Sequence, residues 1–146
     1  YGATIVGLDE IYDQDVDVFA PCALGSIINP DTIDRIKAKV IAGAANNLLE
    51  RPEHDALLKQ RDILYAPDFA INAGGIIDVF HERTGGRPEQ VRAHIETIGD
   101  TLTEIFNRSR RTGLPTGEIA NELAEERFRK HTAGAGLAPG RLARAG

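Results

Sequence analysis

Short apolar runs alternate with stretches of helical periodicity along the first half of the chain. The runs of strand length are residues 3–6 (ATIV), 15–24 (DVDVFAPCAL), 38–45 (AKVIAGAA) and 62–67 (DILYAP). Nearly continuous apolar runs of this kind are typical of strands in a buried parallel sheet. The pattern therefore predicts short strands in these four places.

Two helical segments lie between these runs. In residues 28–39, Asn29 can cap a helix and Pro30 suits its first turn. Residues 52–61 begin at Pro52 and carry acidic residues early and cations late, the order that the helix dipole favours. Strand and helix thus alternate as in βαβ units, and we expect an α/β fold with a doubly wound parallel sheet.

The second half of the chain changes to a long helical period. One apolar stripe is formed by Val91, Ile95, Ile98, Leu102, Ile105 and Phe106. These spacings predict a helix over residues 87–113 that ends at Gly113. Thr116 is expected to cap a final helix. Residues 131–146 are rich in Ala and Gly and have little to bury, so we expect a disordered tail.

Composition and charge exclude several classes of function. The net charge of −5 argues against a nucleic-acid partner, because a phosphate-binding surface needs clustered Lys and Arg. No apolar run is long enough for a membrane span, and the single cysteine, Cys22, excludes an internal disulfide. No zinc-binding motif is present, so no metal site is predicted. The chain opens without an initiator Met, and we expect it to be part of a longer polypeptide.

Small residues and amides follow three of the predicted strands. They are residues 21–25 (PCALG), 43–47 (GAANN) and 71–75 (INAGG). Because the carboxyl ends of parallel strands meet at one edge of a sheet, we expect these segments to form one ligand-binding rim. Asn72 is predicted to cap the next helix and to face the ligand. No partner for a nucleophile is apparent beside Cys22, so a small side chain lining the crevice is the preferred interpretation.

The residues after this rim have two interpretations. Gly74 and Gly75 are predicted to allow close packing at a helix start. Ile76 and Val79 fall on one face of that helix. They are either ordinary core residues or the wall of an apolar substrate pocket.

The chain resembles the coenzyme domain of the leucine, phenylalanine and valine dehydrogenases, relatives of glutamate dehydrogenase. The matching motifs are DVFAPCALG, KVIAGAANN, ILYAPDFAINAGGIIDV and EERF, in the order and spacing of that family, over about residues 1–130. The resemblance implies residues 1–87 as the second half of an NAD-binding Rossmann-like domain, with only the later strands of its sheet. Residues 88–130 would be C-terminal helices.

The resemblance also implies roles for individual residues. Cys22 and Ala23 would lie along the nicotinamide side of the NAD cofactor. Asn46 and Asn72 would contact the nicotinamide ribose, and Asn46 would lie near the substrate as well. Ile76 and Val79 would contact the substrate side chain.

The implied activity is the NAD-dependent oxidative deamination of an L-amino acid to its 2-oxo acid. A glutamate-specific relative has Ser at the position of Val79, so glutamate is disfavoured here. Bulky Ile76 leaves less room for an aromatic ring, which favours a branched aliphatic substrate such as leucine. One methylene changes affinity only modestly in such a pocket, so the sequence does not rank Leu, Ile and Val. A phenylalanine- or valine-preferring enzyme is the alternative.

Parts of the family's machinery are absent from this chain. Its catalytic Lys and Asp residues belong to an N-terminal domain, and no G-x-G-x-x-G turn for the pyrophosphate is present. We therefore predict no catalytic residue here and no activity of the chain alone. The residue that selects NAD over NADP is missing as well. A non-catalytic remnant or interaction module is the alternative from another class. The resemblance implies a cytoplasmic homo-oligomer as the full-length enzyme.

Overall fold

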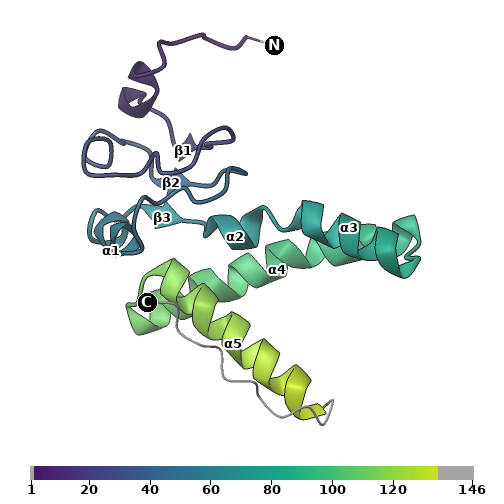
Figure 1. Ribbon diagram of the computed structural model, residues 1–146. Coiled ribbons are helices and arrows are strands. Elements are labelled where there is room, and N and C mark those ends of the chain that lie inside the picture. The colour runs from purple at the N-terminus through teal and green to yellow at the C-terminus, as the bar shows by residue number, and fades with distance from the viewer. Residues whose placement is uncertain (1, 135–146) are drawn as a thin grey trace.

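The computed structural model describes residues 2–134, with side chains through residue 130. It contains a small sheet with one helix beside it, followed by a group of helices (Figure 1). A 3₁₀ turn, η1 (Glu10–Asp13), precedes strand β1 (Val18–Phe19). Strands β2 (Val40–Ile41) and β3 (Leu64–Tyr65) follow, separated by helix α1 (Glu53–Gln60). The C-terminal helices are α2 (Asp68–Ile71), α3 (Gly74–Thr84), α4 (Pro88–Thr112) and α5 (Thr116–Gly134).

The three strands form one parallel sheet in the order β1-β2-β3. Val18 pairs with Val40, and Val40 pairs with Leu64. The parallel α/β arrangement predicted from the sequence is confirmed. In the described part of the chain β1 has a partner on one side only, and Val18 is half exposed.

The predicted strand at residues 3–6 is wrong. The structure shows no strand there, and Ile5 is almost fully exposed. An apolar run forms a strand only when a neighbouring strand supplies its hydrogen bonds, and these residues have no such neighbour.

The predicted helix over residues 28–39 is also wrong, and turns stand in its place. Ile28 forms a parallel bridge with Leu49 instead of entering a helix. The guanidinium of Arg61 donates hydrogen bonds to the carbonyl oxygens of Ile33 and Ile36. Asn29 does cap the single turn that forms, because its Oδ1 accepts the N–H groups of Asp31 at 3.0 Å and of Thr32 at 3.2 Å. Long-range partners therefore replace the ladder that a helix would have used.

The helices predicted at residues 52–61 and 87–113 are confirmed. Helix α4 ends at Gly113, whose φ of 79° is in the left-handed region that glycine adopts at helix ends. Helix α5 has Thr116 as its first residue and not as the residue before it, so the predicted cap is wrong. The hydroxyl of Thr116 donates to the carbonyl oxygen of Tyr65 at 2.7 Å. The predicted tail falls mostly outside the described residues.

Two hydrophobic clusters form the core. The larger one packs around the sheet and contains the fully buried Ile28, Ile41, Leu48 and Leu58. The smaller one joins α4 to α5 through Ile105, Ile119, Ala120 and Leu123. The second cluster lets α4 run back under α2 and α3 towards the sheet (Figure 1).

Candidate functional site

The loops that leave the three strands lie against one another at the carboxyl edge of the sheet. The N–H of Ala45 donates to the carbonyl oxygen of Pro21 at 3.1 Å, and the N–H of Ser26 donates to that of Asn47 at 2.6 Å. A Cβ at Gly43 would overlap the backbone of Pro21. The small residues after β1 and β2 therefore let the two loops touch, and the predicted rim is formed.

Two amide side chains meet on this rim. The Nδ2 of Asn72 donates to the Oδ1 of Asn46 at 2.5 Å, across 26 residues of sequence. Asn46 is exposed and Asn72 is half-buried. Within the described residues, the Nδ2 of Asn46 and the Oδ1 of Asn72 have no protein partner. The pair thus presents the NH₂ group of Asn46 as a donor and the amide oxygen of Asn72 as an acceptor to a ligand at the rim.

Buried polar groups beneath the rim hold its second and third loops together. The carboxylate of Asp68 accepts the backbone N–H of Leu48 at 3.1 Å and the hydroxyl of Tyr65 at 3.2 Å. Burial raises the pKa of the Tyr65 phenol above its usual range, and the neighbouring carboxylate of Asp68 adds to the shift. Tyr65 therefore stays a neutral donor. Sequence reasoning missed this arrangement, because nothing in the pattern indicates a contact between residues 48 and 68.

Cys22 and Ala23 lie in the loop after β1, and both are exposed. The preceding Pro21 is buried and fixes the loop against Gly43. Among the described residues, no group of three His, Cys, Asp or Glu side chains is arranged to hold a metal ion. None of the described helices is long and apolar enough to cross a membrane.

Helix α3 departs from two of the predictions. Its cap is Ala73, whereas Asn72 ends α2, so the predicted capping role of Asn72 is wrong. The side chain of Asn72 is engaged with Asn46 instead. A Cβ at Gly74 or Gly75 would meet nothing within 4 Å, so close packing is not the reason for these glycines in this chain.

Ile76 and Val79 point away from the core of this chain. Their exposed fractions are 74% and 51%, whereas the neighbouring Ile77 is buried at 8%. The core interpretation of this pair is therefore wrong for the described residues. The pocket interpretation remains a prediction, and it requires a partner that covers this face of α3.

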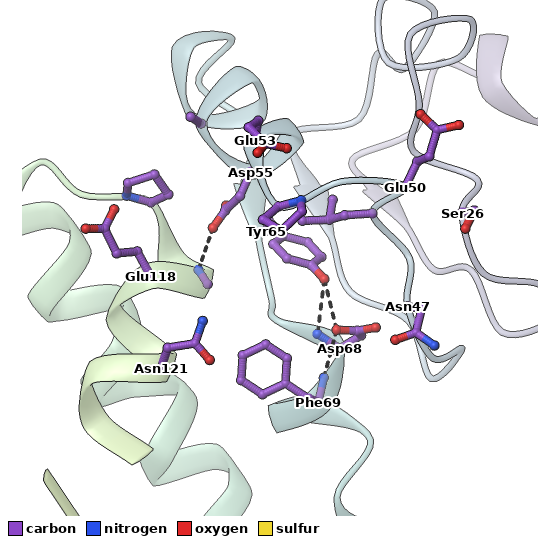
Figure 2. A pocket seen from close by; sticks show the side chains of 15 residues that line it. Ser26, Asn47, Glu50, Glu53, Asp55, Tyr65, Asp68, Phe69, Glu118 and Asn121 are labelled. Carbon is purple, nitrogen blue, oxygen red and sulfur yellow. Dashed lines mark hydrogen bonds between the residues drawn. The ribbon is translucent and has the colours of Figure 1, made fainter. Parts of the chain in front are cut away.

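A separate pocket of about 750 Å³ has Asn47 among its lining residues and opens between α1, α2 and the start of α5 (Figure 2). It contains none of the six residues predicted for cofactor or substrate. The carboxylate of Asp55 accepts the backbone N–H of Gly117 at 2.6 Å (Figure 2). Burial raises the pKa of the Asp55 carboxyl from its ordinary value, against the opposing effect of this hydrogen bond. Asp55 thus fixes the first turn of α5 to α1.

The profile of the "Glutamate/Leucine/Phenylalanine/Valine dehydrogenase" family matches residues 2–136. Leucine dehydrogenase of Thermoactinomyces intermedius is 46% identical over 88% of this chain and 35% of its own length. Phenylalanine dehydrogenase of Caldalkalibacillus thermarum is 45% identical over 86% of this chain and 34% of its own.

A solved structure is similar over the same range. The crystal structure of L-tryptophan dehydrogenase from Nostoc punctiforme matches with a TM-score of 0.86 and 47% identity, over 88% of this chain and 39% of that one. The chain therefore spans about a third of the length of the relatives that it matches. Leucine, phenylalanine and tryptophan dehydrogenases are about equally similar to it.

The family consists of oxidoreductases that act on the amino group of amino acids with a nicotinamide cofactor, and its members form oligomers. Because the family profile matches residues 2–136 and the fold matches that of L-tryptophan dehydrogenase over 88% of the chain, this chain belongs to the Glutamate/Leucine/Phenylalanine/Valine dehydrogenase family.

Proposed function

We propose that the polypeptide containing this chain is an NAD-dependent dehydrogenase of branched-chain L-amino acids. It converts the amino acid, NAD⁺ and water to the 2-oxo acid, ammonium, NADH and a proton. The observation that carries the proposal is the Asn46–Asn72 pair, followed along the chain by the exposed Ile76 and Val79 of α3. A rim of amides is thus succeeded along the chain by an exposed aliphatic face, which suits a polar cofactor bound next to an apolar substrate side chain.

The residues of the rim fit the nicotinamide end of such a cofactor. The unpaired Nδ2 of Asn46 and Oδ1 of Asn72 suit ribose hydroxyls, which donate and accept hydrogen bonds. Cys22 and Ala23 are exposed on the adjoining loop and would line the nicotinamide. The cofactor, when bound, supplies the acceptor for hydride. The residues of this chain hold and orient it, and they exclude water once their open side is covered.

The aliphatic preference rests on Ile76 and Val79. An apolar side chain gains by removing both of them from water, whereas a distal carboxylate would lose its hydration without a compensating partner. An aromatic substrate is the second candidate, because relatives named for tryptophan and phenylalanine are about as similar as the leucine enzyme.

The test is oxidative deamination by the complete polypeptide, read as NADH absorbance, with Leu, Ile, Val, Phe, Trp and Glu and with both NAD and NADP. We expect kcat/KM to be highest for an aliphatic substrate with NAD. A higher value for Trp or Phe establishes the second candidate, and a preference for NADP overturns the cofactor choice. No turnover of any of these substrates favours a non-catalytic module.

Two variants separate the roles of the rim and the helix. Asn72→Ala is expected to raise KM for NAD by about tenfold, because a hydrogen bond to the cofactor is lost. Val79→Ser is expected to lower kcat/KM for leucine by about tenfold and to improve the relative rate with glutamate. We further propose a homo-oligomer in the cytoplasm, which size measurement of the purified enzyme and fractionation of the native host would test.

A further inference from the structure

The pocket beside Asn47 combines an apolar floor with acidic walls. We call it the acidic groove. Its apolar lining includes Leu49, Phe69 and Pro115, and Figure 2 shows Phe69 opposite Asn121 of α5. Five carboxylates also line it: Glu50, Glu53, Asp55, Asp68 and Glu118. No lysine, arginine or histidine is among its lining residues.

Two of these carboxylates are exposed and have no ion-pair partner among the described residues. Asp55 and Asp68 are buried and accept backbone N–H groups, so their charge is used inside the fold. The Oε2 of Glu50 lies 3.9 Å from the Nε of Arg51, at the outer limit of an ion pair. Glu53 and Glu118 are exposed and make no ion pair with any described residue. Carboxylates that line one pocket repel one another, and a cation placed between them relieves the repulsion.

The chain itself contains a segment of matching chemistry. Residues 135–146 (AGLAPGRLARAG) carry Arg141 and Arg144 and no acidic residue. They also carry Leu137 and Leu142, which suit an apolar floor. The family profile ends at residue 136, so most of this segment lies outside the part that is shared with the dehydrogenases.

The length of the segment allows it to return to the groove. From Gly134 back to Thr116, α5 is roughly 27 Å long at the usual helical rise. An extended chain covers about 3.3 Å per residue. Arg141 is therefore within about 23 Å of the end of α5 and Arg144 within about 33 Å. Asn121 and Gly117 lie roughly 20 Å and 26 Å back along α5 from Gly134. Arg141 can therefore reach the level of Asn121, and Arg144 can reach the level of Gly117.

We propose that residues 137–146 dock into the acidic groove of the same chain. Leu142 lies on the apolar floor beside Phe69. Arg141 pairs with Glu118, and Arg144 pairs with Glu53. The groove is thus an intramolecular docking site for an arginine-bearing segment, and the contact ties the end of the chain back to α1 and to the rim.

Photocrosslinking of the complete polypeptide tests this docking. Leu142 is replaced by p-benzoylphenylalanine, and the crosslinked residues are mapped by mass spectrometry after irradiation. We expect attachments within residues 47–56, 65–69 and 115–121. Arg141→Glu combined with Arg144→Glu is expected to reduce their yield at least about threefold, because charge complementarity is reversed at two pairs.

The matched control is Arg83→Glu combined with Arg92→Glu. These two arginines are exposed on α3 and α4, and neither makes an ion pair with a described residue. This variant should leave the crosslink yield unchanged. An equal loss in the control overturns the proposal, as do crosslinks dispersed over other surfaces. Crosslinks between copies, detected by mixing ¹⁴N- and ¹⁵N-labelled protein, overturn the intramolecular form in favour of a second copy as the occupant.

Discussion

The sheet half and the helical half of this chain are stabilised in different ways. Around the sheet, strands of only two residues are held by an almost fully buried cluster that includes Ile28, Ile41 and Leu58. In the helical half, the 25-residue α4 has Ile105 and Ser109 as its only buried residues. The sheet thus depends on contacts between distant segments, whereas α4 carries its own hydrogen-bond ladder. Substitutions should therefore act differently in the two halves.

The largest contrast is expected between two isoleucines. Ile41→Ala in β2 should lower the free energy of unfolding by about 2–5 kcal/mol, because it leaves a cavity in the buried cluster. Ile95→Ala in α4, which is 38% exposed, should cost less than about 1 kcal/mol. Denaturant unfolding of the complete polypeptide, with hydrogen exchange to assign the loss to β2, measures both. Equal losses would contradict the comparison.

A second contrast uses two glycines. Gly43→Ala should destabilise the protein by about 1–3 kcal/mol, because its Cβ would overlap the backbone of Pro21, which cannot rotate away. Gly74→Ala should be neutral or stabilising by up to about 1 kcal/mol, since it lies in a helix with open space around it. Thermal unfolding of the two variants and of the wild type measures both effects on stability. Destabilisation by Gly74→Ala would indicate that α3 is covered in the assembled enzyme.

The contact between the halves comes third. Asp55→Ala should cost about 1–3 kcal/mol, because the N–H of Gly117 loses its acceptor inside the fold. Asp55→Asn keeps an acceptor and should cost less. The raised pKa of Asp55 means that the folded state holds the proton more tightly. The contribution of this carboxyl to stability therefore falls as pH rises from its ordinary value of about 4 through the raised value.

The Asp55→Asn variant cannot ionise at this position, so comparing it with the wild type isolates the effect of Asp55 ionisation on stability. Its stability relative to the wild type should improve as pH rises through the same window. Unfolding curves collected on both sides of the window provide the measurement. A difference between the two proteins that stays constant with pH would show that Asp55 does not titrate differently on unfolding.

The smallest effect is expected at the surface pair between α4 and α5. Arg108 holds the pKa of the Glu126 carboxyl below its usual range through a 2.8 Å ion pair. A lowered pKa stabilises the fold above the ordinary carboxyl value, and the contribution is lost as pH falls through the lowered one. Glu126→Gln should therefore cause a small loss at neutral pH that disappears in acid and in high salt. The matched control is Glu122→Gln, also on α5, which removes a carboxylate that makes no ion pair with a described residue and should cause no such loss at neutral pH.

The sequence predicted the parts of the fold that local rules govern. The stripe from Val91 to Phe106 and the stop at Gly113 determine α4, because a helix satisfies its hydrogen bonds within one segment. The failed helix at residues 28–39 shows the limit of this reasoning. Its backbone groups hydrogen-bond to distant residues: the N–H of Ile28 donates to the carbonyl oxygen of Leu48, and Arg61 donates to that of Ile36. These partners are too far away in the sequence for a local pattern to reveal them.

The same division applies to the site. The motifs at residues 21–25, 43–47 and 71–75 determined that a rim would form, because parallel strands place their carboxyl ends at one edge. Only the tertiary structure decided that Asn46 and Asn72 meet, that Asp68 supports them, and that Ile76 and Val79 face outwards. Side-chain partners depend on how distant segments pack. Periodicity reports which face of an element is apolar, and packing alone determines what that face touches.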